Sequence, residues 1–586
     1  MLAITHLGIL LTAQVACAFN AGKHVDGNTK LWQIQNGPNA PQQKPLALKK
    51  PTGNVAKATM GGSKDSSSSN YTSLLDALDI MQDHFFEVSF GTWPDAIDWT
   101  AAVLGTHISA TLSSISSHLP NDPTINEIRD HENTINRYFT QLSTFYFGEN
   151  AFSLRNQAYD DMLWVVLDWL EAIMFIKQHS SLYKPETSTS GSLGASSWYA
   201  RQFAPQFSHR ARVFYDLASK GWDETLCGGG MVWNPDLYPY KNAITNQLFI
   251  AASISMYLHF PGDDDDAPFA SESVGIGSIP PAKARDEIYL HNAVKGYQWL
   301  KNSGMRNGQG LYVDGFHIGG WRPRNPGTRR CDVRNEMVYT YNQGVILTGL
   351  RGLWEATGER EYLDDGHHLI QSVIAATGWA GRDKPGHWRW AGLGRNGVLE
   401  EVCDWSGICS QNGQTFKGIF FHHFSVFCAP LTNENDEGRP WLRDNDVHAR
   451  HQQKCQQYAG WINWNADAAT LTKDSNGEFG EWWGREAYDA EIEEPSYDGT
   501  DYRNFVVPQD DVWQISEIRE DVLDDTLERR QELRLRFLKE ATPREKPVDE
   551  RDINDRGRGR TVETQSGGLS VVRAAWKLAQ SAKDGI

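Results

Sequence analysis

The sequence predicts an all-α fold, with one large helical domain in the middle of the chain. Apolar residues recur at i, i+3, i+4 spacing over many segments, strand-like alternation is scarce, and loops rich in Gly, Pro and Asn separate the segments. About a dozen helices over roughly 400 residues, joined by long loops, are typical of one all-α unit. A helical bundle and a closed helical toroid both fit this pattern.

The chain begins with a predicted secretory signal peptide, residues 1–18, which is apolar from Leu7 onward and ends in the small-x-small triplet Ala16-Cys17-Ala18. Residues 19–75 are rich in Lys, Gly, Pro, Asn and Ser and predict a flexible leader. A glycosylation sequon begins at Asn70. We therefore expect a secreted protein, extracellular or associated with a cell wall.

Cysteine count agrees with secretion. Cleavage after residue 18 would remove Cys17 and leave six cysteines, an even number that predicts three disulfides among fifteen possible connectivities. Cys403 and Cys409 are the easiest pair to close, because they are only six residues apart. The other pairings stay open, as does the alternative that some of the six are buried thiols.

The helical domain is expected over residues 76–484. Within it, segment 160–179 is apolar on nearly every side, which predicts a fully buried helix, as for an inner helix of a toroid. Segment 360–371 has a polar face and predicts an outer helix. The expected helices, in chain order, are 76–90, 96–118, 123–146, 160–179, 198–219, 241–259, 284–303, 338–357, 360–377, 415–429 and 446–471.

Residues 485–586 predict a charged tail, partly helical or disordered. Its segment 515–541 has Leu and Ile at roughly helical spacing among many charges, which favours a solvated helix, with a partner-binding helix as the alternative. After the signal peptide no stretch reaches the roughly 18 apolar residues of a membrane span. The C-terminus also lacks the apolar tail of a GPI signal.

Composition narrows the function classes. The formal net charge of −18 argues against a nucleic-acid binder. The chain has no H-E-x-x-H motif and no phosphate-binding P-loop, and adjacent histidines are poorly spaced for metal ligation, so we expect no metal and no cofactor. The 22 Trp residues would suit sugar ligands, although many could equally lie in the core.

Two adjacent carboxylates, Asp160 and Asp161, open the apolar segment 160–179. They could simply cap a helix and favour its dipole. A helix this apolar must, however, begin against packed protein or a cavity. Adjacent Cα atoms are about 3.8 Å apart, so the two carboxyl groups can reach the roughly 5 Å separation that retaining glycoside hydrolysis requires.

Six ordered segments between residues 76 and 484 resemble glycoside hydrolase family 76, the α-1,6-mannanases of bacteria and fungi. The resemblance begins at YDDMLWVVLDWLEA and continues through GWDETLCGGGMVWNPDLYPYKNAITNQLFIAAS, GLYVDGF, YTYNQGVILTGL and FKGIF to NADAA with GEFGEWWG. It implies an (α/α)6 barrel whose open end holds a mannan-binding groove. The family's aromatic pair after the carboxylates is reduced here to Trp164.

The resemblance also implies roles for individual residues. Asp160 would be the nucleophile and Asp161 the acid/base of a retaining endo-α-1,6-mannosidase, and we expect a monomer that binds α-mannan. Helix capping and packing are the alternative roles for the sugar-binding candidates. These candidates are Trp164, Gly229, Gly230, Trp233, Asn242, Asn246, Asp314, Tyr341, Asn342 and Gln343.

Two other functions remain open. A transglycosidase of the same fold would pass the mannosyl intermediate to a GPI-anchor or cell-wall glycan, and the missing GPI tail favours hydrolysis over it. A non-catalytic mannan-binding protein on a decayed barrel is the third possibility. Retention of both carboxylates argues against that one.

Overall fold

Six largely buried helices form the inner ring of an (α/α)6 barrel in the computed structural model, which describes residues 66–118, 124–155, 157–183, 198–264, 281–381, 389–432, 438–484, 494–501 and 552–584. Each inner helix contacts the next, and the last contacts the first to close the ring. The predicted all-α barrel is therefore confirmed. The inner helices are α3 (Asp98–Ser116), α6 (Tyr159–Ser180), α8 (Ala243–His259), α10 (Tyr341–Thr357), α12 (Gln411–Phe427) and α16 (Val562–Asp584).

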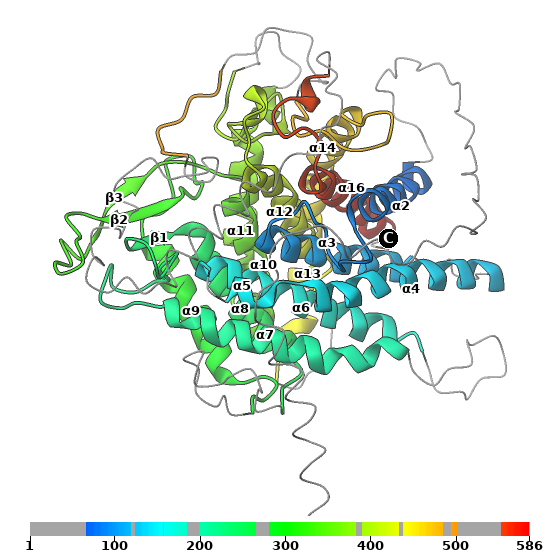
Figure 1. Cartoon of the computed structure of the whole chain (residues 1–586), viewed down its shortest axis with the longest axis horizontal. Coiled ribbons are helices and arrows are strands. Elements are labelled where there is room, and N and C mark those ends of the chain that lie inside the picture. Colours follow the sequence, from blue (N-terminus) through cyan, green and yellow to red (C-terminus); the bar gives the residue numbers. More distant parts are fainter. Residues whose placement is uncertain are drawn as a thin grey trace, which may run out of the picture. The chain divides into compact units, whose positions relative to one another are not determined.

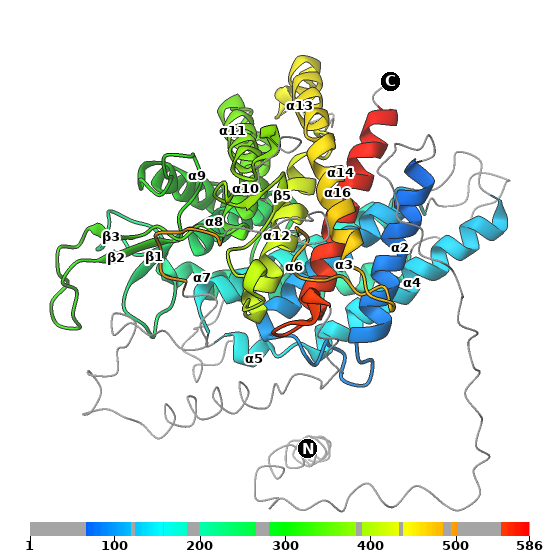
Figure 2. The ribbon, with the colours of Figure 1, turned by 90° about the horizontal axis from the view of Figure 1, so that it is seen from above.

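The remaining long helices alternate with the inner ones along the chain and pack outside them (Figure 1, Figure 2). In α11, Tyr362, Leu363, Leu369 and Ile370 form one buried face, as expected for an outer helix. The outer helices are α2 (Ser66–Phe85), α4 (Ile125–Gly148), α7 (Ala204–Ala218), α9 (Glu287–Asn302), α11 (Arg360–Ala376), α13 (Asn445–Gln457) and α14 (Ala459–Leu471).

Short elements connect these helices. They are α5 (Ala151–Leu154) and the 3₁₀ helices Tyr199–Phe203, Ser219–Gly221, Trp379–Gly381, Asp404–Ser406, Pro440–Arg443 and Ile553–Asp555.

Most predicted helix positions are confirmed, and α6 is buried nearly all round as its composition requires. Two of the larger differences lie in the second half of the expected domain. Helix α12 begins before residue 415, because the Ser410 hydroxyl accepts a hydrogen bond from the Gly413 amide at 3.4 Å and caps the helix there. The predicted helix 446–471 is two helices that meet at Tyr458.

The N-terminal boundary of the helical unit lies before residue 76. Helix α2 begins at Ser66, inside the expected leader, and packs against α16. Leu74, Leu78 and Met81 are fully buried at helical spacing. This apolar stripe explains why the segment is ordered in spite of the serine run at its start.

At the C-terminal end, the expected boundary at 484 is corrected more strongly. Within the expected tail, residues 562–584 form the sixth inner helix, α16, which lies between α14 and α2 in both ribbon views (Figure 1, Figure 2). Val562, Leu569 and Val571 of α16 are completely buried. The segments before α16 are strongly charged, so the average composition of residues 485–586 predicts a tail although its last segment is apolar.

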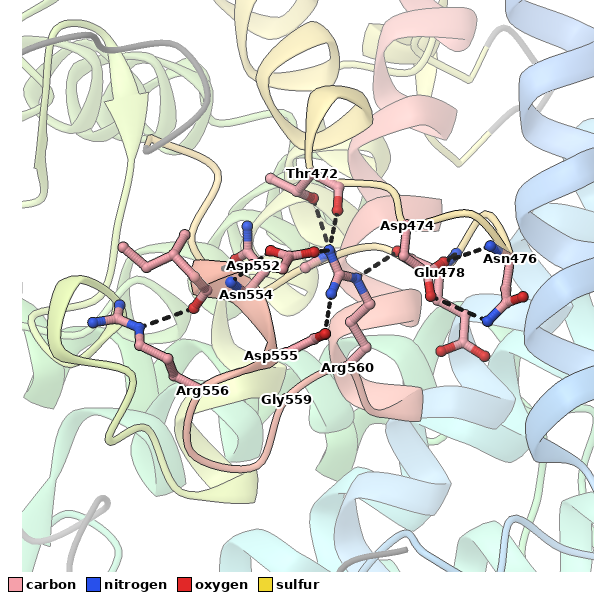
Figure 3. A network of polar contacts seen from close by, with 12 residues as sticks. Thr472, Asp474, Asn476, Glu478, Asp552, Asn554, Asp555, Arg556, Gly559 and Arg560 are labelled. Carbon is pink, nitrogen blue, oxygen red and sulfur yellow. Dashed lines mark hydrogen bonds and ion pairs between the residues drawn. The ribbon is translucent and has the colours of Figure 1, made fainter. Parts of the chain in front are cut away.

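A polar clamp fastens the segment before α16 to the loop after α14 (Figure 3). The guanidinium of Arg560 donates to the carbonyl oxygen of Thr472 at 2.7 Å and to that of Glu478 at 3.1 Å. It also pairs with the carboxylates of Asp552 and Asp555. Because the guanidinium is buried, these partners compensate for its desolvation.

Two small antiparallel sheets lie in the loops. The first has the order β1 (Tyr240–Asn242), β2 (Gly315–Ile318), β3 (Cys331–Asn335), with Lys241 opposite Phe316 and Phe316 opposite Arg334. The second pairs β4 (Gly394–Arg395) with β5 (Val398–Leu399). Strand β1 runs directly into α8, so the larger sheet lies at the N-terminal end of that inner helix.

Three disulfides link the six cysteines, as the even count predicts: Cys227–Cys331, Cys403–Cys409 and Cys428–Cys455. The predicted signal peptide and the predicted helix 515–541 lie outside the described residues. Among the residues that are described, none of the helices has the length and apolar character needed to cross a membrane.

Candidate active site

The N-termini of the inner helices meet at one end of the barrel, where side chains connect them. Glu563 of α16 accepts hydrogen bonds from Thr100 of α3, at 3.0 Å, and from Gln411 of α12, at 2.8 Å. Gln247 of α8 donates to the carbonyl oxygen of Asn342 in α10 at 2.7 Å. The helix ends therefore surround one region of the structure, and α6 begins there with Asp160 and Asp161.

The two aspartates have different surroundings. Asp160 is 2% exposed, whereas Asp161 is partly exposed. Oδ2 of Asp161 accepts a hydrogen bond from the Ala158 amide at 3.2 Å, which caps the helix. The capping role that the sequence left open thus applies to Asp161, while Asp160 is held by other groups.

Trp233 fixes the orientation of Asp160. Its indole Nε1 donates to Oδ2 of Asp160 at 3.0 Å, and the amide of Asp161 donates to Oδ1 of Asp160 at 3.2 Å. Backbone hydrogen bonds hold Trp233 in place. Its amide donates to the carbonyl oxygen of Tyr240 at 2.8 Å, and its carbonyl oxygen accepts from the amide of Tyr159 at 2.9 Å. Both oxygens of Asp160 are therefore positioned before any ligand arrives, and the N-terminal end of the helix dipole favours their negative charge.

Three predicted amide residues hold backbone in this region. Asn242 caps α8 by accepting from the Thr245 amide at 3.3 Å. Asn246 accepts from the Met231 amide at 2.7 Å and donates to the Met231 carbonyl oxygen at 3.2 Å. Gln343 forms the same pair of bonds with Tyr312, at 2.8 and 2.9 Å. These side chains thus support the loops that surround the aspartates.

Asp314 joins three elements at the same end of the barrel. Its carboxylate accepts from the Tyr240 hydroxyl at 2.7 Å, from Asn342 at 3.3 Å and from Asn335 at 3.4 Å. Tyr341 stacks on Phe416 with ring centroids 3.9 Å apart. All of these side chains are buried, so in the folded chain they tie β1, β3 and α10 together.

The remaining candidates are placed in packing contacts. Trp164 is 3% exposed and stacks on the partly exposed Trp99. Gly229 and Gly230 adopt φ values of +131° and +87° and pass over the indole of Trp299. A Cβ on Gly230 would lie 2.5 Å from that indole, which explains the glycine at this position.

A second group of carboxylates was not singled out from the sequence. Glu400, Glu401, Asp404 and Glu481 are all buried near the N-termini of α10 and α12. Glu401 accepts from the Thr340 amide at 2.8 Å, just before α10, and Asp404 pairs with Lys417 of α12 at 2.5 Å. The adjacent pair Glu400-Glu401 after a glycine-rich loop was the available sequence signal, the same kind of signal as Asp160-Asp161.

These buried acids predict a pH-dependent stability. Burial raises the pKa of Glu401 from 4.5 to about 8 and that of Glu400 to about 7. Between pH 6.5 and 8 the folded protein therefore holds protons that the unfolded chain has lost, so the free energy of unfolding falls as pH rises. In Glu401→Gln we expect the free energy of unfolding to fall less steeply with pH. The slope should become smaller in magnitude by up to about 1.4 kcal/mol per pH unit, as measured by denaturant unfolding at pH 6.5, 7.2 and 8.

Glu359→Gln is the matched control, because Glu359 is exposed and follows α10 at its other end. It should leave the slope unchanged. An equal slope in wild type and Glu401→Gln would contradict the protonated state assigned to Glu401.

Two groups of potential metal ligands occur in the described part of the chain. One consists of His367, His451 and Cys455, and the other of Cys403, Asp404, Cys409 and Glu481. Every cysteine in these groups is part of a disulfide. Neither group therefore offers a thiolate, the form in which cysteine binds a metal.

The chain matches the family model described as Glycosyl hydrolase family 76 over residues 116–274 and 282–509, more than half of its length. Among curated relatives, it is 24% identical to mannan endo-1,6-alpha-mannosidase DCW1 of Saccharomyces cerevisiae over 42% of this chain and 45% of that protein. It is 23% identical to mannan endo-1,6-alpha-mannosidase DFG5 of Candida albicans over 38% of this chain and 41% of that protein. The matches thus span less than half of the length of these relatives.

Solved structures with similar folds include the GH76A alpha-1,6-mannanase from Salegentibacter, with 17% identity, a TM-score of 0.46, and coverage of 87% of this chain and 99% of that one. Dfg5 from Chaetomium thermophilum, solved in complex with glucosamine, has 16% identity and a TM-score of 0.44, and the match covers 74% of this chain and 86% of that one.

Proposed function

The chain belongs to glycosyl hydrolase family 76, and on that premise we propose that it is a retaining endo-α-1,6-mannosidase that hydrolyses α-1,6-linked mannan. The names of its curated relatives support the substrate. The observation that carries the proposal is the adjacent pair Asp160 and Asp161 at the start of a buried inner helix, with Asp160 oriented by Trp233. Two carboxyl groups with different surroundings are what retaining hydrolysis requires.

In the first step, a carboxylate oxygen of Asp160 attacks the anomeric carbon of a mannose residue. The bond between that carbon and the glycosidic oxygen breaks, and Asp161 gives its proton to the departing oxygen. The hydrogen bonds to Asp160 from Trp233 and the Asp161 amide hold the nucleophile in line for this attack. The product is a mannosyl ester of Asp160.

In the second step, Asp161 takes a proton from a water molecule as that water attacks the same anomeric carbon. The ester bond to Asp160 breaks, the mannose is released with its original configuration, and both aspartates return to their starting forms. We propose that Asn246, Gln343 and Asp314 act indirectly in both steps, by holding the loops around the aspartates.

We predict a measurable loss of activity in Trp233→Phe, which keeps an aromatic ring but removes the N–H donor to Asp160. A hydrogen bond to a charged group contributes about 1.5–3 kcal/mol, so kcat for mannan hydrolysis should fall by roughly 10- to 100-fold. Trp464→Phe is the matched control, because its indole donates to the Asn396 carbonyl oxygen instead. An unchanged kcat in Trp233→Phe would show that the indole N–H of Trp233 does not position Asp160 for the reaction.

The protein is further proposed to be secreted and monomeric. The predicted signal peptide supports secretion, and so do the six cysteines that follow it, which are all paired in disulfides. Detection of the mature chain in culture medium, beginning after residue 18, would test the first point. Light scattering would test the second.

The proposed function is tested by the products formed from linear α-1,6-mannan. We expect reducing ends to appear along with oligosaccharides of several lengths, and proton NMR should detect the α-anomer first. Initial formation of the β-anomer would overturn retention, and release of mannose alone would overturn endo action. Transfer to added α-1,6-mannosides faster than hydrolysis would identify a transglycosidase, and binding without turnover would identify a lectin.

A further inference from the structure

A pocket lies beside the outer helix α9, and neither Asp160 nor Asp161 is among its lining residues. Its volume is about 590 Å³, within the range of small-molecule sites. The lining comprises parts of α9 and of two loops that meet at the Cys227–Cys331 disulfide. Trp222 and Trp299 provide its aromatic surface, and Lys295, Arg329, Arg330 and Glu224 provide its charge.

The aromatic surface is held in place by contacts around Gly229. A Cβ on Gly229 would lie 3.1 Å from both Trp222 and Trp299, so the two indoles lie on this glycine. The indole of Trp299 donates to the Cys227 carbonyl oxygen at 3.1 Å, and that of Trp222 to Glu224 at 3.3 Å. Both rings are partly exposed, which is the usual arrangement for an aromatic that packs against a sugar ring.

The charged surface is positive. Lys295 pairs with Glu224 at 2.6 Å and lies over the Trp222 ring, so these two charges offset each other. Arg330 lies near the exposed Asp332, whose pKa is lowered chiefly by a hydrogen bond from the Gly319 amide and to a lesser degree by Arg330. The guanidinium of Arg329 forms no ion pair with any residue that the structure describes, and its side chain is exposed. The pocket thus retains cationic groups for an incoming anion.

The backbone around the arginines is strained and cross-linked. Cys227 and Arg329 both adopt a φ of +57°, in the left-handed region that non-glycine residues avoid. The Cys227 amide donates to the Arg329 carbonyl oxygen at 2.9 Å, and the disulfide joins the same two loops. Strained conformations that the surrounding structure holds rigidly are typical of ligand sites.

The same loop reaches the aspartate site. Gly230 follows the glycines that border the pocket, Met231 is held by Asn246, and Trp233 donates to Asp160. The segment 228–233 therefore borders the pocket at one end and contacts Asp160 at the other.

From these contacts we propose that the pocket binds a hexose carrying a phosphate group, with the sugar against Trp222 and Trp299 and the phosphate on Arg329 and Arg330. Arginine forms paired, charge-assisted hydrogen bonds with phosphate oxygens. The site goes beyond the proposed function, since neutral α-1,6-mannan would not need the arginines. It would allow the protein to select phosphorylated glycans or to hold them during hydrolysis.

Calorimetry on the full chain tests this proposal with mannose 6-phosphate, mannose, inorganic phosphate and glucuronic acid. We expect mannose 6-phosphate to bind at least tenfold more tightly than the other three, and its affinity to fall with added salt. Equal affinity for mannose and mannose 6-phosphate would overturn the role of the arginines. Equal affinity for inorganic phosphate would overturn the sugar surface, and equal affinity for glucuronic acid would overturn the preference for phosphate.

Variants locate the binding. The double variant Arg329→Ala/Arg330→Ala should lose the preference for mannose 6-phosphate, and Trp222→Ala should weaken binding of the sugar phosphate but not of inorganic phosphate. Arg450→Ala is the control, because Arg450 is exposed on α13 and lines no part of this pocket. Full affinity in the double arginine variant would overturn the proposal.

The double variant should hydrolyse neutral linear mannan at the wild-type rate. The two proposals can therefore fail separately. If the wild type hydrolyses mannan but shows no preference for mannose 6-phosphate, only the proposed phosphate site is wrong. If it prefers mannose 6-phosphate but does not hydrolyse mannan, only the proposed function of the aspartates is wrong.

Discussion

Asp160→Asn should lower kcat for the hydrolysis of linear α-1,6-mannan by at least about 10³-fold, the scale at which loss of a reacting carboxylate affects a glycosidase. The amide keeps the size of the side chain and can still face Trp233, but it cannot attack the anomeric carbon. Reducing-end release, measured under substrate saturation, gives kcat. Folding should be unaffected, so the midpoint of thermal unfolding should stay close to that of the wild type.

Asp161→Asn should lose as much activity on mannan for a different reason, since it lacks the proton for the departing oxygen. Its first step should recover on an aryl α-1,6-mannobioside with an acidic phenol, because such a leaving group departs without protonation. Asp160→Asn should not recover on that substrate, because it cannot form the mannosyl ester. This difference separates the two assigned roles.

Asp364→Asn serves as the control for both substitutions, since Asp364 lies exposed on the outer helix α11 and pairs only with Lys454 among its described ion-pair partners. It should retain full activity. Wild-type turnover in either Asp160→Asn or Asp161→Asn would exclude that residue from the reaction, and recovery of Asp160→Asn on the aryl substrate would reverse the assignment.

A chain that ends at residue 551 should fail to fold, because it lacks the sixth inner helix. Val562, Leu569, Val571 and Trp576 of α16 are almost completely buried. Burial of each side chain contributes about 1.5–3 kcal/mol, so the four together contribute roughly as much as the whole net stability of a typical protein. We expect the truncated chain to lose its cooperative thermal transition, as measured by circular dichroism.

A milder substitution tests the same point within the full-length chain. Leu569→Ala should lower the free energy of unfolding by about 2–5 kcal/mol, since it opens a cavity between α16 and its neighbours. Leu471→Ala makes the same chemical change at a side chain that is 46% exposed, and should cost less than about 1 kcal/mol. Equal effects of the two substitutions would show that α16 is not a core element.

The loss of activity in the aspartate variants depends on a residue pair that the sequence identifies. The failure of the truncated chain to fold depends on α16, which the sequence predicts to be part of a tail. Asp160 and Asp161 stand out because they open a segment without a polar face. Segment 562–584 has the apolar pattern of a buried helix, but it follows a long charged region whose composition predicts a solvated tail. Only the packing of α16 against α12, α14 and α2 shows that it belongs to the barrel.

The binding candidates illustrate a similar limit. Asn246 and Gln343 have the side chains that sugar recognition uses. In each of them, however, the side-chain oxygen and the side-chain NH₂ group both form hydrogen bonds with loop backbone. An amide suits either task, because it donates and accepts hydrogen bonds equally well with sugar hydroxyls and with peptide groups. Nothing in the local sequence distinguishes the two uses.

By itself, the sequence determined the helical class, the approximate position of most helices, the burial of α6 and the aspartate pair at its start. These properties follow from the spacing of apolar residues along a single segment, which is a local feature of the chain. The closure of the ring by α16, the hydrogen bond from Trp233 to Asp160, the buried acids around Glu401 and the pocket at Trp222 and Arg329 depend on the tertiary structure. Each of them joins residues far apart in the chain, and such contacts depend on how the helices pack and not on the pattern within any one of them.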